Sequence, residues 1–193
     1  MKKYAFLFLL FTIGFSNAQD NQAILENHFN TNRSQMGLSQ EDVSDFKVNS
    51  STFSKSMRLD NVYVSQRISG IEVFNSTSVF GIKNGIVVSS KLGFTTNSLQ
   101  KINTSSPAIT AQIAIANAAM AIGVSAPTSL EIVETISNNS FIFNTGAISL
   151  NNIPVSLVFQ PMEDNTLRLA WDLSIYLLDA SHYYSMRIDA ITG

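Results

Sequence analysis

The sequence predicts an α+β protein made of two small lobes of antiparallel sheet, each with a helix packed on one face. Three observations support this fold class. Apolar and polar residues alternate with a period of two in many segments, which is typical of strands with one buried face. Two segments show apolar residues at helical spacing, and an unpatterned polar stretch separates the two halves. The predicted division is a signal peptide over residues 1–18, a first lobe over 19–97 and a second lobe over 98–193.

The N-terminus has the three parts of an export signal. Lys2 and Lys3 form a positive region, residues 4–15 form an apolar one, and the small residues 16–18 (Ser-Asn-Ala) form a cleavage site. The apolar run is shorter than the roughly 20 residues that a membrane-spanning helix needs. The sequence therefore predicts a secreted or periplasmic protein that has no membrane association once the signal is removed.

The composition excludes several classes of function. The chain has 193 residues, no cysteine and a formal net charge of -2. An exported protein without cysteine has no disulfide, no thiol nucleophile and no thiolate metal site, so its fold must depend on its hydrophobic core. Nucleic-acid binding requires a basic patch, and this composition gives none. We therefore expect no nucleic-acid partner.

The first lobe is predicted to begin with a helix over residues 22–36. Apolar residues recur there at three- and four-residue spacings, and Gly37 is positioned as a C-cap. Ser39 and Asp42 resemble a capping box that opens a short turn. An extended segment and a serine-rich loop at 49–55 follow.

Residues 59–94 are predicted to form a meander of short antiparallel strands, around which the rest of the chain is organised. Val62, Val64 and Ile68 alternate with neighbours of the opposite face, so one side of this strand is buried. Asn84-Gly85 between apolar alternations predicts a type I′ hairpin, because both central residues need positive φ. The register that this hairpin fixes puts Ile82 opposite Val87 and Phe80 opposite Ser89, with Phe80, Ile82 and Val87 on one face.

The second lobe opens with the strongest helix signal of the chain. Ser106 is positioned to cap the helix, Pro107 takes its first helical position and Gly123 closes its C-terminus. Small alanine side chains let a helix lie close on a sheet, and almost no charge occurs within the segment, so we expect this helix to be well buried. The face predicted to be buried comprises Ile109, Ile113, Ala116 and Met120, extended by Ile115, Ala119 and Ile122.

Period-two patterns return after this helix. Short strands are predicted around Phe141 and Phe143 and over residues 155–159. The longest clean alternation covers 167–175, and a last one covers 184–190. A helix on one face of an antiparallel sheet is the economical solution to these patterns.

No constellation of reactive side chains emerges from the sequence. His28 and His182 are far apart in the chain, and neither lies in a His-Glu-x-x-His motif. His28 lies among apolar residues, which favours a structural role, and His182 lies in an expected exposed turn. Glu131 and Glu134 could form an acid/base pair, but nothing distinguishes them from surface carboxylates. We expect no catalytic residue, no metal site and no cofactor.

Several sequence runs resemble one known family of secreted proteins. The run NVYVSQRISGIEVFN at 61–75 resembles the hallmark run of the fungalysin/thermolysin propeptide family, which has a Val-Tyr strand, a glutamine, a turn and then Ile-x-Val. The hairpin KNGIVV at 83–88 is similar to the strand pair that follows in that family. This sequence departs from the family pattern at Ser69 and Glu72.

The second half resembles the PepSY-like part of the same propeptides. The resemblance is carried by the alanine-rich helix, by the run LAWDL at 169–173 and by the run RIDAITG at 187–193. The run GLSQEDV at 37–43 resembles the segment that precedes them in bacterial fungalysin-like enzymes. The resemblance covers nearly all of the chain after the signal, and it implies a cystatin- or PepSY-like fold for the two lobes.

The function that the resemblance implies is that of a pro-region, which inhibits a secreted zinc metalloprotease within the same chain and assists its folding. The implied partner is the catalytic domain of that protease, in cis or in trans. The zinc-binding motif of such a domain does not occur in this sequence, so we expect a non-enzymatic chain and a fragment of a longer precursor. The implied docking surface is the exposed side of the central meander, with Tyr63, Gln66, Arg67 and Asn75 as candidate binding residues.

Two alternatives to the pro-region stay open at the level of sequence. One is a free-standing exported module that uses a PepSY-like sheet to hold a peptide or to restrain unrelated proteases. The other is a hydrolase in its own right, which stoichiometric zinc binding together with casein cleavage would reveal.

Overall fold

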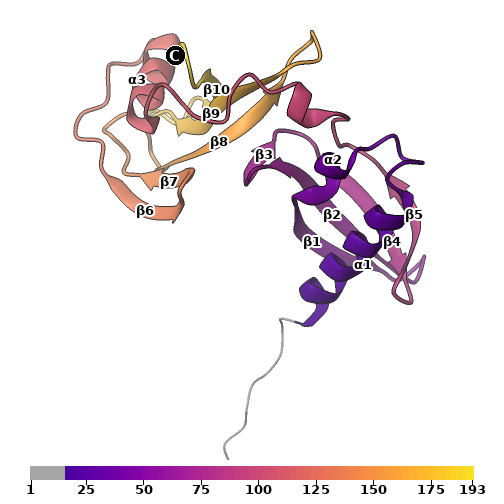
Figure 1. Cartoon of the computed structure of the whole chain (residues 1–193). Helices are drawn as coiled ribbons and strands as arrows, with labels where there is room; N and C mark the ends of the chain where they lie inside the picture. The colour runs from indigo at the N-terminus through magenta and orange to yellow at the C-terminus, as the bar shows by residue number, and fades with distance from the viewer. Residues whose placement is uncertain (1–15) are drawn as a thin grey trace, which may run out of the picture.

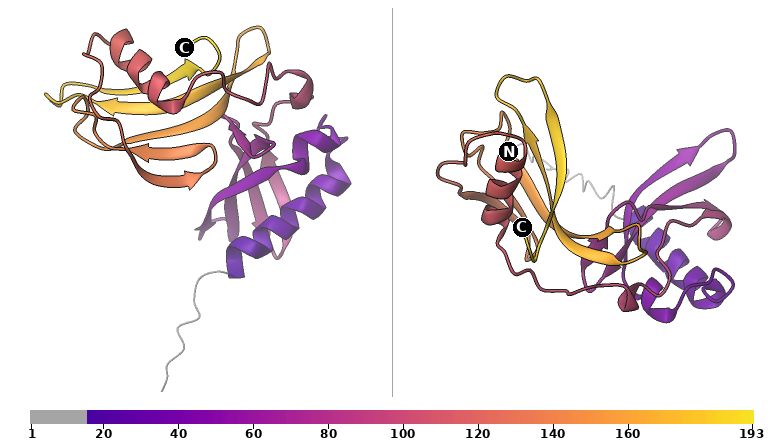
Figure 2. Two further views of the ribbon diagram at one scale, coloured as in Figure 1. Left: turned by 60° about the vertical axis from the view of Figure 1, so that its left-hand side comes forward. Right: turned by 90° about the horizontal axis from the view of Figure 1, so that it is seen from above.

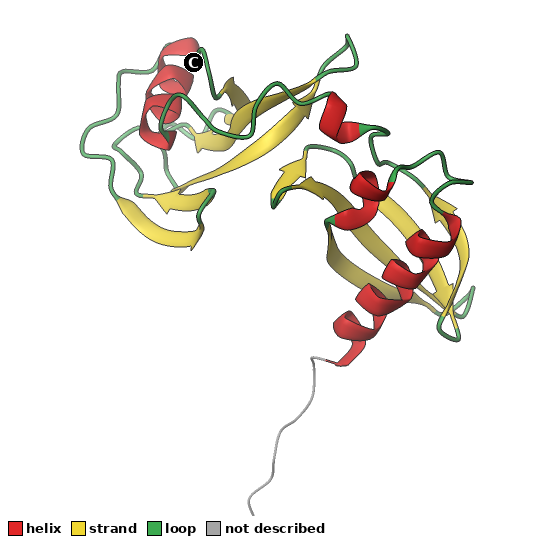
Figure 3. Ribbon diagram, in the orientation of Figure 1, coloured by secondary structure: helices red, strands yellow, loops and turns green. Residues whose placement is uncertain are grey.

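The computed structural model describes residues 16–193 and shows a mixed α+β fold that is mostly sheet (Figure 1, Figure 3). The α+β class predicted from the alternation is therefore confirmed. The predicted signal peptide lies outside the described residues except for 16–18, which begin the first helix. Export remains a prediction.

Three α-helices, one short 3-10 helix and ten strands make up the described residues. The first half contains α1 (Ser16–Asn32), α2 (Gln40–Ser44), β1 (Phe46–Ser54), β2 (Leu59–Ile68), β3 (Ile71–Val73), β4 (Ser78–Lys83), β5 (Ile86–Lys91) and η1 (Ser98–Gln100). The second half contains α3 (Ala111–Ala121), β6 (Ile132–Ser137), β7 (Ser140–Phe143), β8 (Ile153–Pro161), β9 (Leu167–Tyr176) and β10 (Tyr183–Asp189).

The ten strands form one continuous sheet whose main path runs β10-β9-β8-β3-β2-β4-β5. Strand β1 pairs with β2, and the β6–β7 hairpin pairs with β8 through β7. All neighbours are antiparallel except β3 and β8, which run parallel. The prediction of purely antiparallel sheet is therefore wrong at this junction. A parallel pair requires a long connection, and residues 74–152, which include β4, β5, α3 and the β6–β7 hairpin, supply it.

The sheet packs around two separate hydrophobic cores (Figure 1, Figure 2). The first core gathers Leu25 and Phe29 of α1 against β1, β2 and β4. The second core gathers α3 against β7, β8 and β9. Ile71 and Val73 of β3 belong to the second core, although they lie within the segment assigned to the first lobe. The predicted boundary at residue 97 lies in the connecting segment, while β3 ties the two cores together.

Phe29 is the centre of the first core. Its ring lies edge-to-face with Phe46 at 5.2 Å and with Phe80 at 5.4 Å, and stacks with Phe94 at 5.6 Å. Such aromatic pairs stabilise a core beyond the area that they bury. Helix α1 ends at Asn32, four residues before the predicted end. The side chain of Asn32 bonds back to a backbone carbonyl of α1, and a series of turns then leads to Gly37.

The β4–β5 hairpin has the predicted type I′ turn. Asn84 and Gly85 have φ angles of +52° and +75°. Ile82 faces Val87 as predicted, but Phe80 faces Ser90 and not Ser89. The reason is a β-bulge after the first pairs of the hairpin, which adds one residue to β5 and shifts the rest of the register.

Helix α3 begins later than the sequence predicts. Its N-cap is Thr110, whose hydroxyl accepts a hydrogen bond from the backbone N–H of Ile113 at 3.3 Å. The helix does not start at Pro107, because the backbone N–H groups of Ala108 and Ile109 donate to the carbonyl of Ala190 after β10. The C-terminal prediction is confirmed, since Gly123 follows the helix with φ +75°.

The buried face of α3 is the predicted one only in part, because Ile115 and Ala119 of the predicted set are buried but two of its central members are not. Ile113 and Met120 are 46% and 61% exposed. Nearly every residue of this helix is apolar, so the sequence does not single out one face. Alanine gives the closest approach of the helix to the sheet, and the structure buries the alanine-rich face. The buried residues are Ala111, Ala114, Ile115, Ala118 and Ala119.

The late strands agree well with the predicted alternations. Strands β7, β8, β9 and β10 cover the predicted segments, and the apolar positions of β9 from Leu167 to Ile175 are all buried. Strand β6 is missing from the prediction. All six of its residues are exposed, so no buried face imposes an alternation on them.

The assignment of the α3 face leads to a stability prediction. Ala118→Leu should lower the free energy of unfolding by about 1–3 kcal/mol, because the larger side chain overpacks the contact with the sheet. Ile113→Ala should change it by less than about 1 kcal/mol, because Ile113 is half exposed. Urea unfolding followed by the fluorescence of Trp171, the single tryptophan, measures both. The reverse order of the two losses would contradict this packing.

Candidate docking face

Three of the four predicted docking residues lie on accessible surface. Val62 and Val64 of β2 pack in the first core, so the odd-numbered positions of β2 form the opposite face. On that face Tyr63 is 37% exposed and Arg67 is half-buried. Asn75 is exposed in the turn after β3, with φ +57°. These three side chains can contact a partner without any rearrangement of the core.

Gln66 is fully buried, so its prediction as a docking residue is wrong. Its side-chain amide donates to the carbonyl oxygens of Asp42 at 3.1 Å and Thr95 at 2.9 Å, and its Oε1 accepts from the N–H of Thr95 at 2.8 Å. Its own backbone N–H donates to Ser76 Oγ at 2.9 Å. The physical reason is the alternation of side chains along a strand, which places Gln66 on the same core-facing side of β2 as Val64. A polar side chain is tolerated there because its donors and acceptors are satisfied.

The carboxylate of Asp42 organises the same buried region. Its Oδ2 accepts from the backbone N–H groups of Ser39 at 2.9 Å and Asn97 at 2.8 Å. Its Oδ1 accepts from the backbone N–H of Ser98 at 2.7 Å and from the hydroxyl of Ser98 at 2.8 Å. The predicted capping box of Ser39 and Asp42 is confirmed, and Asp42 also fixes the segment that leads to the second core.

The hydrogen bonds decide the ionisation of Asp42. Burial by itself raises the pKa of this carboxyl, but the donors from Ser98, Ser39 and Asn97 outweigh burial and lower the pKa below its ordinary value. Asp42 is therefore a buried carboxylate that stays ionised. Among the described residues, no buried side-chain nitrogen or oxygen is left without a partner.

Arg67 is held in place by Asp45. Its Nε and Nη2 donate to Oδ1 of Asp45 at 2.9 and 2.7 Å. Oδ2 of Asp45 accepts from the backbone N–H of Gly70 at 2.7 Å. Charge-assisted hydrogen bonds of this kind fix the plane of the guanidinium group. Arg67 therefore presents a preordered cationic group at the end of β2.

The face that carries Tyr63 and Arg67 continues into the second half of the sheet. Arg67 lies opposite Glu72 of β3, and Glu72 lies opposite Val158 of β8 across the parallel junction. Residues paired in this way share one face of a sheet. Helices α1 and α3 pack on the other face (Figure 2). We call the side of Tyr63, Arg67, Glu72 and Val158 the uncovered face because neither α1 nor α3 packs on it, although Val158 itself is only 6% exposed.

Arg187 of β10 contacts three other side chains on the uncovered face in the second half. Its Nη1 lies 3.4 Å from Oδ1 of Asp172 and donates to Ser185 Oγ at 2.8 Å. Its guanidinium carbon lies 4.3 Å from the centre of the Phe74 ring, a cation–π contact. Burial raises the pKa of Asp172, Arg187 opposes that rise, and the like charge of Glu72 adds to it. This cluster connects β10 to the residue that follows β3.

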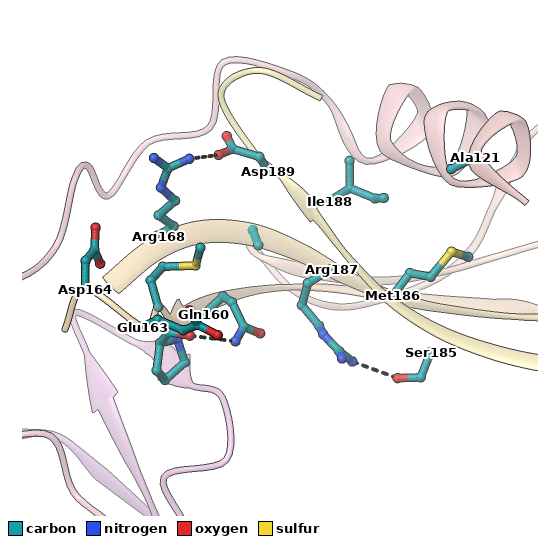
Figure 4. Close-up of a pocket in the computed structure, with 13 residues that line it drawn as sticks. Ala121, Gln160, Glu163, Asp164, Arg168, Ser185, Met186, Arg187, Ile188 and Asp189 are labelled. Carbon is teal, nitrogen blue, oxygen red and sulfur yellow. Dashed lines mark hydrogen bonds and ion pairs between the residues drawn. The ribbon is translucent and has the colours of Figure 1, made fainter. Parts of the chain in front are cut away.

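A hollow of about 860 Å³ lies beside this cluster (Figure 4). It is lined by parts of β8, β9 and β10, by the β8–β9 turn and by the end of α3. Arg168 and Asp189 form an ion pair at 3.3 Å on one wall, and Met162 and Met186 provide apolar surface. No sequence pattern predicts this hollow, because its lining is spread over three strands, a turn and a helix that meet only in the folded chain.

The two histidines are structural or exposed, as the sequence predicts. His28 is half-buried, with its ring near Phe29 at 6.3 Å and Phe80 at 6.0 Å, and burial lowers its pKa. His182 is exposed and stacks on Tyr184 at 5.6 Å. Over the part of the chain that the structure describes, no group of three or more His, Cys, Asp or Glu residues is placed to hold a metal ion.

Comparison of the chain with protein-family models and with curated proteins found no match. The resemblance to the fungalysin/thermolysin propeptide family therefore remains a prediction from the sequence runs. Within residues 16–193, no helix has the length and apolar character needed to span a membrane.

The depressed pKa of Asp42 predicts a pH dependence of stability. A carboxyl whose pKa is lower in the folded state stabilises the fold above its unfolded-state pKa, about 4, and loses this contribution as the pH falls through the folded-state pKa. Asp42→Asn should cost about 2–4 kcal/mol at neutral pH, because its amide brings donors toward the existing N–H groups. The difference in unfolding free energy between wild type and Asp42→Asn should shrink below about pH 4.

Urea unfolding followed by circular dichroism at several pH values measures this difference. Ser98→Ala is the milder companion variant, because it removes one of the four donors to Asp42 and should cost less than Asp42→Asn. A wild-type advantage over Asp42→Asn that stays constant down to about pH 2 would contradict the assignment.

Alanine substitutions of Gln66 and Tyr63 should lower the free energy of unfolding by different amounts, because these two residues lie on opposite faces of β2. Gln66→Ala should lower the free energy of unfolding by about 2–3 kcal/mol, because Thr95 loses its hydrogen-bond partner inside the protein. Tyr63→Ala should cost less than about 1 kcal/mol, since its side chain is on the accessible face. Thermal and urea unfolding of both variants test this. Equal losses would show that the side assigned to Gln66 is incorrect.

Proposed function

We propose that this protein is the pro-region of a secreted zinc metalloprotease, and that it inhibits the catalytic domain and assists its folding by docking its uncovered face against it. The continuity of that face carries the proposal. Through the β3–β8 junction, Tyr63 and Arg67 share one surface with Arg187 and with one wall of the hollow. That wall is formed by Arg168, Ala170 and Asp189. A surface that is ordered before binding loses less conformational entropy on docking than a flexible one. The sequence runs that resemble the propeptide family support the same conclusion.

We infer that the first core belongs to a lobe of the fungalysin/thermolysin propeptide type and that the second core belongs to a PepSY-like lobe. Each core has one main helix against one face of the sheet, α1 in the first and α3 in the second, which supports a cystatin- or PepSY-like arrangement. Strand β3 contributes side chains to the second core while it pairs with β2 of the first. Under this proposal the two lobes act as one docking body.

The physical basis of inhibition is tethering. A folded sheet beside the catalytic cleft blocks access of substrate and stabilises the neighbouring domain while that domain folds. While both belong to one chain, the effective concentration is around millimolar, so a modest intrinsic affinity is sufficient. Proteolysis of the connection ends that advantage. Under this proposal the pro-region itself performs no catalysis and holds no cofactor, and the catalytic domain supplies the zinc chemistry.

The alternative function is that of a free-standing exported module that binds a peptide or restrains unrelated proteases. The hollow of about 860 Å³ favours this alternative, because its size suits a small ligand or several side chains of a peptide. Genomic context separates the two. An in-frame downstream segment that encodes His-Glu-x-x-His favours the pro-region, and a stop codon followed by an unrelated gene favours the module.

Titration of the purified protein into a thermolysin-like zinc protease from the same source tests the proposed function. We expect inhibition at micromolar concentration and an increased yield of active protease after refolding. Absence of both effects would rule the proposal out.

Two aromatic side chains of the same sheet give a matched test of the docking face. Tyr63→Ala should weaken inhibition roughly tenfold, since exposed aromatic residues at the centre of an interface often contribute most of its binding energy. Phe53→Ala at the β1–β2 hairpin, where Phe53 is 57% exposed, should leave the inhibition constant unchanged. Stronger weakening by Phe53→Ala than by Tyr63→Ala would place docking at the hairpin instead.

A further inference from the structure

Strand β6 differs from the other strands at the edges of the sheet. Over residues 16–193, β1, β5, β6 and β10 each lack a strand partner on one side. Edge strands usually carry charges, often lysine, that discourage pairing with other chains. Strands β1, β5 and β10 each contain a basic residue, namely Lys47, Lys91 and Arg187, whereas β6 contains no basic residue and no proline. Strand β6 instead carries one acidic residue, Glu134, and two register shifts, and it lacks the basic charge that the other three edge strands present.

The side chains of β6 are apolar and accessible. Ile132, Val133 and Ile136 are 47%, 58% and 59% exposed. β-Branched residues of this kind favour strand pairing. Val133 and Ile136 have no partner residue in β7, because the register shifts at both positions. Figure 1 shows β6 at the outer side of the second half of the sheet. Half of the strand thus offers apolar β-branched side chains to solvent.

An apolar groove of about 300 Å³ runs beside this edge. It lies between Ile132 and Phe141 of the β6–β7 hairpin and the segment that leads into α3, including Pro107 and Ile109. Trp171 also lines it, and its indole N–H donates a hydrogen bond to the carbonyl oxygen of Ile109 at 3.0 Å. The groove therefore offers mainly apolar contact. A strand added to β6 would place every second side chain on the side of the sheet where this groove lies.

The charges around β6 have a single sign. Glu131 and Glu134 are both exposed, and the β6–β7 hairpin, residues 131–143, contains no lysine, arginine or histidine. Opposite charges on directly paired strand residues are favourable, and like charges are unfavourable. The edge therefore complements an extended segment that combines apolar residues with lysine or arginine.

A second copy of this chain fits the edge poorly. In the antiparallel register centred between Ile132 and Val133, self-pairing places Glu131 of each copy opposite Glu134 of the other, and in every register the hairpin supplies no basic side chain to pair with these glutamates. Like charges across a strand pair are destabilising. The charge pattern thus favours a different, basic partner.

We propose that the outer edge of β6 is a binding site for an extended basic and apolar peptide segment, which adds as a further strand and places an apolar side chain in the groove next to Trp171. Backbone hydrogen bonds along an open edge provide affinity, and the groove and the two glutamates provide selectivity. This inference does not depend on the proposed pro-region function, which uses the uncovered face.

The test uses the purified protein and two fluorescein-labelled peptides of alternating valine and threonine, one with two lysines and the other with glutamates at those positions. Fluorescence polarisation should show roughly threefold to tenfold tighter binding of the lysine peptide. Glu134→Lys should reverse the preference. Glu41→Lys changes the net charge equally at an exposed position of α2, away from both the groove and the hollow, and should leave the preference as it is. Amide hydrogen exchange in the presence of the lysine peptide should slow within residues 131–137.

Four results would overturn the inference. Equal binding of the two peptides would show that charge complementarity does not select the partner. Absence of binding at about millimolar peptide concentration would show that the edge of β6 is not a peptide site. Slowed exchange at β1, β5 or β10 in place of β6 would assign peptide binding to another edge. A concentration-dependent dimer in sedimentation, with slowed exchange at β6, would show that a second copy occupies the edge.

Discussion

The buried carboxylate of Asp42 is the interaction on which the arrangement of this protein depends. It accepts four hydrogen bonds, one from the N-cap of α2 and three from Asn97 and Ser98, where the chain leaves the first core. Next to it, Gln66 connects the centre of β2 to Thr95 and to the carbonyl of Asp42 itself. A low-dielectric interior strengthens such hydrogen bonds and makes any unpaired group costly, so the network specifies one path for the connecting segment.

The second constraint is the junction between β3 and β8. Strand β3 has three residues, and its parallel pairing with β8 joins two antiparallel regions into one sheet. Ile71 and Val73 pack into the second core, while Glu72 between them faces the other way and continues the uncovered face. One short strand thus sets the relation between the two cores and between the side chains exposed on either side of it. Arg187, stacked on the Phe74 ring, fastens the edge strand β10 to the residue next to this junction.

The two proposed interaction surfaces use different physical properties of the same sheet. The uncovered face presents ordered ion pairs, such as Arg67 with Asp45 and Arg187 with Asp172, together with Tyr63. Ordered polar groups of this kind contribute more to specificity than to affinity, which suits a partner held in the same chain. The edge of β6 instead offers free backbone groups, β-branched side chains and two glutamates. Such an edge selects an extended segment by main-chain pairing and by charge.

The sequence by itself determined the features that depend on neighbouring residues. The Asn84-Gly85 turn, the capping box of Ser39 and Asp42 and the long alternation of β9 all follow from local conformational preferences and a period of two, and the structure confirms them. The same parity could have shown that Gln66 points into the core, but its polarity suggested the surface. Only the tertiary structure decided that α3 packs through its alanines, that β3 pairs parallel to β8 and that β6 forms an exposed edge. Each of these features depends on contacts between residues that are far apart in the chain. A local sequence pattern does not contain the free energy of such contacts.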